Sequence, residues 1–594
     1  MRLRMESKLS SFLYAKLLNK HLYIDLWIYL SPIILSLISM SYLLKPGYSG
    51  FMDNGGLALD INEYIKLALS PWGFWFGPSL LLQELVYLVV PSKTLAWKIS
   101  IFMYQYLTFI CSYLGFTKMY KTFIRNVTDD AIKITLYLLA LGYAFNIYVV
   151  GGLWNFYLPQ FQNSYTFGIL YISYFITSIF YLIKNEKPKI LNIIKNFIIT
   201  IILGILSSTA PNFLVMSTLV IISILLLIML INNISTLRKI GVLFYTALLI
   251  TMSAMYYIID ILLIYKDNSS ITSYINYKGI EVYGWNVLNI LTFSYNSGTI
   301  NTIFGILYIH QLVIPSALPY YLPYAINYYL SIVLLARSRI REVKIISLGI
   351  MISELINAIF LSGTVGNSTL NELYRLGIEY GILPKFILPT FLDQLPNLEF
   401  FFLISYINIF LFYSLLINKE LLKTKINNHY LIREKQLAII CILIVISPII
   451  FNFISIQYNI YAKLINPAEI PSYYGELFNF IRNHEDHYYL WIPFYGILSW
   501  RESFMSNIPG YLSEYYGVKP LYINNITIVY QLSQGTVPVN EFKKYNIGYI
   551  VVIENFTEIN QYMWQNAIQT IRSNPEYFKL IFTAGNVCVY EVNI

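Results

Sequence analysis

Long apolar segments recur along most of this 594-residue chain, and they constrain its fold more than any other feature. A helix needs about 20 consecutive, mainly apolar residues to cross the hydrocarbon core of a bilayer. Only 12% of the residues are charged, against about 25% in soluble domains. The sequence therefore predicts an α-helical polytopic membrane protein and excludes most soluble enzymes. About eleven crossings are predicted, at Ile24–Leu44, Leu95–Phe116, Ile132–Val150, Thr166–Ile183, Leu191–Leu206, Phe213–Ile231, Ile240–Tyr265, Pro319–Ala336, Ile345–Leu361, Phe400–Ile417 and Leu437–Ile454.

The basic residues predict how the chain is oriented in the membrane, because lysine and arginine gather in cytoplasmic loops. Of the 40 basic residues, 24 fall in the N-terminal segment and in alternate loops, whereas the opposite loops hold eight. This distribution predicts a multi-pass protein of the cell membrane with a cytoplasmic N-terminus. An odd number of crossings then places the C-terminus outside. The net charge of +9 reflects this topology and does not indicate a nucleic-acid partner.

The composition changes after Ile454, which divides the chain into a transmembrane domain, residues 1–454, and a small extracytoplasmic α/β domain, residues 455–594. The second part holds eight basic and eleven acidic residues. Asn525 and Asn555 each begin an Asn-x-Thr pattern, which is typical of N-glycosylation. One helical run and four β-rich runs are predicted, at Tyr473–Asn483, Tyr488–Phe494, Ile547–Ile553, Phe578–Thr583 and Val587–Val592.

The long first external loop, residues 45–77, carries three carboxylates close to the membrane surface: Asp53, Asp60 and Glu63. A carboxylate at that level can act as a general base towards an acceptor hydroxyl if the substrate lies within hydrogen-bond reach. The alternative is a solvated loop in which Asp60 caps a helix over Ile61–Leu69.

Other charged residues have both a functional and a structural interpretation. Arg375 and Lys385, in the external loop Ser362–Leu398, can pair with a donor phosphate or be ordinary surface charges. Asp260 and Glu354 fall inside predicted helices, where an ionisable group usually faces a cavity or a partner. Each can line a substrate groove, relay protons in a transporter or be a structural carboxyl.

No metal site is assigned. The cluster His484-Glu485-Asp486-His487 lacks the His-Glu-x-x-His spacing that places two imidazoles on one helix face, which favours a solvated loop. A divalent ion is compatible with the sequence, but nothing in it requires a metal or another cofactor.

Four short segments carry a family resemblance. Asp53 follows the first apolar segment, and after it comes a stretch of small and aromatic residues that ends in Ser70-Pro71-Trp72. The others are Ala144–Val149, Ser207–Phe213 and Phe391–Phe400, the last containing Asp393. In this pattern the chain resembles the GT-C superfamily of membrane glycosyltransferases, and in particular its arabinofuranosyltransferase-like branch. The family usually has arginine before the late acid, whereas this chain has Leu392, and the Trp-Trp-Asp motif of oligosaccharyltransferases is absent.

The resemblance implies a hexosyl- or pentosyltransferase that moves a sugar from a polyprenyl-phosphate-linked donor to a glycan, lipid or protein acceptor at the outer face. It implies that Asp53 is the catalytic base, with Asp60 as the second choice. The substrate-binding residues would be Glu63, Arg375, Lys385 and Asp393. Two alternatives stay open. One is a transporter or flippase of a lipid-linked or glycan substrate, which predicts inverted repeats; the other is a non-catalytic GT-C-like surface protein.

Overall fold

The structure is a computed structural model, and it describes part of the chain. The described residues are 20–39, 85–86, 88–90, 92–124, 130–145, 159–184, 188–207, 211–231, 235–255, 327–362, 394–417, 470–498, 504–505, 508–516, 521–523, 525–557 and 561–593, with the single residues 439, 442, 443, 446 and 518.

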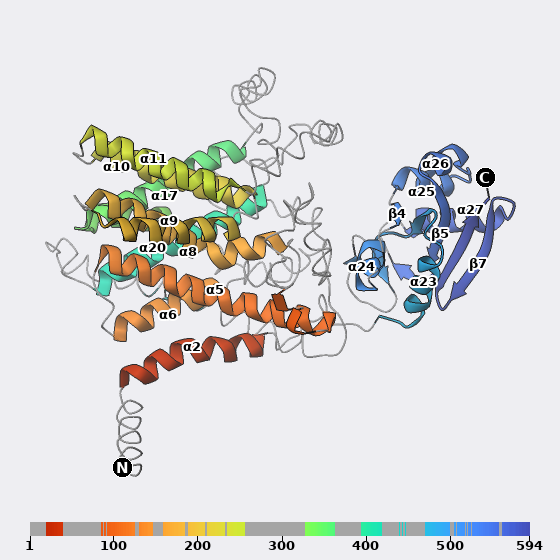
Figure 1. Cartoon of the computed structure of the whole chain (residues 1–594), viewed down its shortest axis with the longest axis horizontal. Helices are drawn as coiled ribbons and strands as arrows, with labels where there is room; N and C mark the ends of the chain where they lie inside the picture. Colours follow the sequence, from red (N-terminus) through yellow and green to blue (C-terminus); the bar gives the residue numbers. More distant parts are fainter. Residues whose placement is uncertain are drawn as a thin grey trace, which may run out of the picture.

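The described residues up to 417 form a bundle of long apolar helices (Figure 1). Two of the helices begin at a proline, Pro159 and Pro211. Proline is favourable in the first turn because a backbone N–H there would have no hydrogen-bond acceptor within the helix. Ser92 caps a third through a hydrogen bond from the N–H of Leu95, 3.3 Å long. The helices are α2 (Lys20–Ser39), α5 (Lys93–Phe123), α6 (Asp130–Ala144), α8 (Pro159–Lys184), α9 (Ile190–Ser207), α10 (Pro211–Ile231), α11 (Thr236–Ser253), α17 (Arg341–Ser362) and α20 (Gln394–Ile417); residues 327–337 are also helical.

Within the described ranges, four helices are long and apolar enough to cross a membrane: Lys98–Phe123, Asn163–Lys184, Ile190–Ser207 and Thr236–Ser253. Helix α5 continues seven residues beyond the predicted end at Phe116. Its last turns are amphipathic, and a helix can continue into the headgroup layer once its lysines reach water. The total of about eleven crossings stays a prediction.

Glycine allows two pairs of helices to approach closely. A Cβ atom on Gly204 of α9 would lie 2.2 Å from Oγ of Ser253 on α11, and one on Gly349 of α17 would lie 2.4 Å from Cγ1 of Ile224 on α10. Small residues at helix contacts are the usual way in which membrane helices gain van der Waals packing.

Residues 470–593 form a different kind of structure, built on a five-stranded sheet of order β4-β1-β5-β8-β7. Strands β4, β1 and β5 are parallel to one another, whereas β8 is antiparallel to both β5 and β7. A smaller antiparallel sheet has the order β3-β2-β6. The strands are β1 (Tyr488–Ile492), β2 (Gly496–Leu498), β3 (Phe504–Met505), β4 (Tyr522–Ile523), β5 (Ile547–Ile553), β6 (Phe556–Thr557), β7 (Phe578–Ala584) and β8 (Val587–Val592).

Five helices accompany these strands (Figure 1). Strand β5 is buried along almost its whole length, which explains its continuous run of apolar residues. Helix α27 packs against β1 and brings the fully buried Trp564 into edge contact with the ring of Phe494. The helices are α23 (Tyr473–Arg482), α24 (Ile508–Tyr515), α25 (Ile526–Ser533), α26 (Val539–Lys544) and α27 (Gln561–Ser573). The predicted domain boundaries at residues 454 and 455 stay a prediction.

Candidate functional site

Basic side chains tie the helices together at one end of the bundle, called the basic end below. Lys184, the last residue of α8, pairs with Glu342 at the start of α17 over 2.8 Å. Arg238, at the start of α11, donates to the carbonyl oxygen of Leu182 on α8. Lys133, near the start of α6, pairs with Asp25 near the start of α2. The first two contacts join the end of α8 to the starts of α17 and α11, which run in the opposite direction, whereas the third joins the starts of two helices that run in the same direction.

The opposite end of the bundle, called the polar end, is held by hydrogen bonds to backbone carbonyl groups. Gln105 of α5 donates to the carbonyl oxygen of Ala144, the last residue of α6. Near the same helix end, the hydroxyl of Tyr143 donates to the carbonyl oxygen of Tyr165 over 2.7 Å, and that of Tyr406 donates to Gly142 over 3.1 Å. Because the Gln105, Tyr143 and Tyr406 side chains are buried, each bond satisfies a side-chain donor that would be costly to bury alone.

The sequence-predicted site residues Asp53, Asp60, Glu63, Arg375, Lys385 and Asp393 lie outside the described residues, as does Asp260. The helices that flank them are described. Helix α2 begins at the basic end, so its last residue, Ser39, lies at the polar end, where the chain continues towards Asp53, Asp60 and Glu63. Helix α5 begins at the polar end as well. Helix α17 also begins at the basic end, so the segment with Arg375, Lys385 and Asp393 departs at the polar end. Chain topology therefore attaches both segments to the same end of the bundle.

Glu354 is described, and it belongs to a buried polar network inside the bundle. Its side chain is 1% exposed, and its Oε1 accepts a hydrogen bond from the amide of Asn327. Asn408 of α20 donates to Asn327 over 2.6 Å and to Ser331 over 2.8 Å, and it accepts from Ser347 over 2.9 Å. The network joins α17, α20 and the helical segment 327–337.

Sequence reasoning found Glu354 but missed its partners. Asn327 and Asn408 each interrupt an apolar run, and an amide in such a run is the signal that would have identified them. The second carboxyl oxygen of Glu354 has no hydrogen-bond partner among the described residues. One acceptor in the network is therefore open to a donor from elsewhere.

Replacing Asn408 by leucine is expected to destabilise the bundle. The substitution removes three hydrogen bonds and leaves polar groups of Asn327, Ser331 and Ser347 buried without this partner. Such bonds contribute only about 0.6 kcal/mol each in membrane proteins, so the free energy of unfolding should fall by about 1–2 kcal/mol. Thermal unfolding of the purified chain in detergent measures the loss. Thr135→Val is the control, because the Thr135 hydroxyl bonds to Ala131 in its own helix; equal midpoints for both variants would contradict the role of the network.

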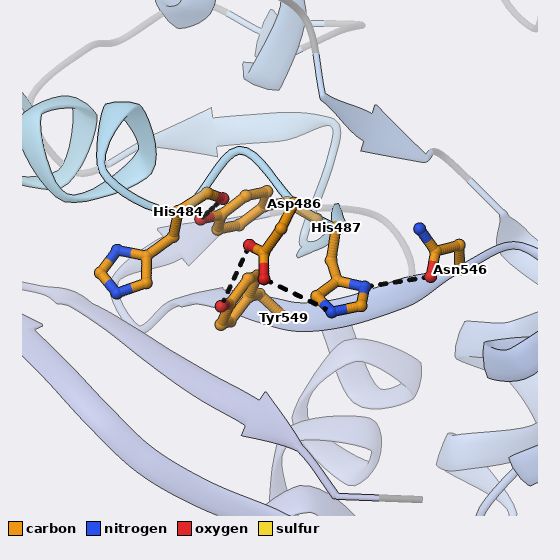
Figure 2. A network of polar contacts seen from close by, with 6 residues as sticks. His484, Asp486, His487, Asn546 and Tyr549 are labelled. Carbon is orange, nitrogen blue, oxygen red and sulfur yellow. Dashed lines mark hydrogen bonds and ion pairs between the residues drawn. The ribbon is translucent and has the colours of Figure 1, made fainter.

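The histidine cluster lies in the loop between α23 and β1, and Figure 2 shows the ring of His484 turned away from Asp486 and His487. Nδ1 of His484 contacts the carbonyl oxygen of Phe480 at 2.9 Å, and Nδ1 of His487 contacts Oδ1 of Asn546 at 3.0 Å. The two imidazoles therefore do not converge on one point. No group of three or more metal-binding side chains occurs in the part of the chain that the structure describes.

The tyrosines beside this cluster explain its geometry. The Tyr489 hydroxyl donates to the carbonyl oxygen of His484 over 2.9 Å, and the Tyr549 hydroxyl donates to Asp486. Burial, followed by the nearby Tyr549 and Asp486, raises the pKa of Tyr489, so this hydroxyl stays a donor at neutral pH. The cluster is a loop held by hydrogen bonds to its neighbours.

Comparison with known proteins gives low-identity matches only. No protein family and no curated protein match the sequence. The structure is similar to the arabinofuranosyltransferase AftD from mycobacteria, with a TM-score of 0.48 and 11% identity over 96% of this chain. It is also similar to ArnT from Cupriavidus metallidurans bound to undecaprenyl phosphate, with a TM-score of 0.44 and 9% identity over 96% of this chain and 97% of that one.

The chain spans 40% of the length of AftD. AftD is an arabinofuranosyltransferase, the kind of enzyme that the sequence resembles. A similarity of this extent assigns no role to any residue of the present chain.

Proposed function

We propose that this chain is a membrane glycosyltransferase of the GT-C type, which transfers a sugar from a polyprenyl-phosphate-linked donor to a cell-surface glycan, lipid or protein. Support comes from the sequence motifs and from the arrangement of the helix ends. The segment with Asp53 and the segment with Arg375, Lys385 and Asp393 attach to the polar end of the bundle. Within the described helices of the bundle, most lysines and arginines lie at the basic end, whereas Lys93 and Lys98 lie near the start of α5.

The arrangement of charge supports an outer-face site. Lysine and arginine mark the cytoplasmic side of a membrane protein, so the basic end faces the cytoplasm in this proposal and the polar end faces outwards. A polyprenyl chain lies among the lipids, and its phosphate lies at the headgroup level. The described ends of α2 and α17, from which the chain continues towards Asp53 and towards Arg375 and Lys385, lie at the polar end.

The chemistry requires few groups. The oxygen of an acceptor hydroxyl attacks the anomeric carbon while the bond from that carbon to the phosphate oxygen breaks. Asp53 takes the hydroxyl proton as general base, and polyprenyl phosphate leaves with the electron pair of the broken bond. Arg375 and Lys385 pair with that phosphate, whereas Glu63 and Asp393 accept hydrogen bonds from the sugar hydroxyls. Asp60 is the second choice for the base.

A transfer assay tests the proposal. Proteoliposomes with the full chain receive a radiolabelled polyprenyl-phosphate sugar and a mixture of cell-envelope acceptors. Time-dependent movement of label into a product that has lost the polyprenyl group supports the proposal. If a panel of pentosyl and hexosyl donors leaves all label on the lipid, the function is wrong.

Glu354 favours one other function, a transporter of a lipid-linked or glycan substrate. It is a buried intramembrane carboxyl with one oxygen that has no hydrogen-bond partner among the described residues, and such groups commonly mark proton or substrate pathways. The same proteoliposomes distinguish the two, because transport moves the intact labelled lipid between leaflets without forming a product.

A further inference from the structure

A cavity with lysine and other polar side chains lies at the basic end of the bundle, between α5, α8 and α9. Helix α8 packs against both of the other two (Figure 1). Near its last two turns this cavity opens, with a volume of about 300 Å³, at the lower limit of the volumes typical of ligand pockets. Its polar lining consists of Lys118 and Thr122 from α5, Thr177, Tyr181 and Lys184 from α8, and Asn196 from α9.

The lining of this cavity carries a net positive charge, which comes from Lys118. The Lys118 ammonium lies over the ring of Tyr174, 4.7 Å from its centroid, which holds it in place through a cation–π contact. Within the described ranges no carboxylate pairs with Lys118, and Lys121 and Lys195 are near enough to repel it. Glu342 neutralises Lys184 alone. A half-buried ammonium among like charges is stabilised by an anion.

We propose that this cavity binds the phosphate headgroup of an anionic membrane phospholipid. Lys118 supplies the charge for a phosphate, and the amide of Asn196 supplies a hydrogen-bond donor. The ammonium of Lys184 is shared with Glu342, and the Thr122 hydroxyl donates to the carbonyl oxygen of Lys118 in its own helix. Basic pockets between helices on the cytoplasmic side are a general way of holding such headgroups. The site is separate from the polar end, so the proposal does not depend on the proposed glycosyltransferase activity.

The neighbouring surface indicates a lipid as the source of the phosphate. Helix α9, which forms one wall of the cavity, presents large apolar side chains outwards, with Leu191 75% exposed and Ile194 and Ile198 each 50% exposed. In a membrane protein such a face contacts acyl chains. A phospholipid can therefore place its tails along α9 while its phosphate reaches Lys118.

Lipid binding to the purified full chain tests the proposal, measured by native mass spectrometry with phosphatidylglycerol as the probe. Lys118→Gln should raise the Kd about fivefold, which corresponds to about 1 kcal/mol for one lysine near a headgroup. Lys118→Arg keeps the charge and should stay within about twofold of the unaltered chain. Lys239→Gln is the matched control, because Lys239 also lies at the basic end but donates to the carbonyl oxygen of Met229.

The outcomes separate the explanations. An unchanged Kd in Lys118→Gln overturns the site. An equal increase of the Kd in Lys239→Gln also overturns it, because it means that the lipid is attracted by diffuse charge. If phosphatidylcholine binds as tightly as phosphatidylglycerol, the site does not require a lipid with net negative charge, and the proposal is wrong. Inorganic phosphate displacing the lipid at equal concentration overturns the lipid as source. If Lys118→Gln fails to fold, Asn196→Leu serves instead, with a weaker Kd expected and an unchanged Kd contradicting the proposal.

Discussion

Replacing Asp53 by asparagine is expected to reduce sugar transfer by roughly 10²–10⁴-fold, the usual contribution of a positioned general base. The amide has nearly the same shape as the carboxylate but cannot accept the proton of the attacking hydroxyl. The loss should therefore appear in kcat, with the KM for the donor changed little. Initial rates with the labelled polyprenyl-phosphate sugar measure both constants.

Two companion variants make the Asp53 result specific. Asp25→Asn is the same chemical change at the basic end, where Asp25 pairs with Lys133, and transfer should stay within about twofold of the unaltered chain. Asp60→Asn tests the second choice for the base. Full activity in Asp53→Asn together with a large loss in Asp60→Asn would move the role to Asp60, and full activity in both would remove this loop from the chemistry.

Trp564→Ala is expected to lower the free energy of unfolding of residues 470–593 by about 3–5 kcal/mol, the range for truncating a large aromatic side chain in a core. Trp564 is fully buried and meets the rings of Phe494 and Tyr495 edge-on, both at about 5 Å between centroids. Alanine leaves a cavity among these rings that the rigid sheet cannot fill.

The measurement is pulse proteolysis of the full chain across a urea series, following fragments from this C-terminal part. Tyr562→Ala is the matched control, because it truncates another aromatic side chain on the same helix that is 77% exposed; its free energy should change by no more than about 0.5 kcal/mol. Equal urea midpoints for the two variants would contradict the assignment of Trp564 to the core.

Several elements could be predicted because their signals are local. The structure has β5 over Ile547–Ile553 and β8 over Val587–Val592, the ranges that the β-rich runs predict. Helix α9 covers Ile190–Ser207, within one residue of the predicted segment at both ends. Backbone groups inside a membrane must form their hydrogen bonds within the protein, so an apolar run predicts a helix of about the same length. The site residues Asp53, Asp60, Glu63, Arg375, Lys385 and Asp393 stay predictions.

The sequence by itself determined that this chain is built mainly of apolar helices, that its basic residues are concentrated in alternate loops, and which segments carry candidate carboxylates. Each of these features depends on residues close together in the chain. Only the tertiary structure decided which helix ends meet. Glu354 is 27 residues from its partner Asn327 in the sequence, and Asn327 is 81 residues from Asn408. The Lys118 cavity is formed by three helices. Such contacts arise from packing between distant segments, which no local pattern encodes.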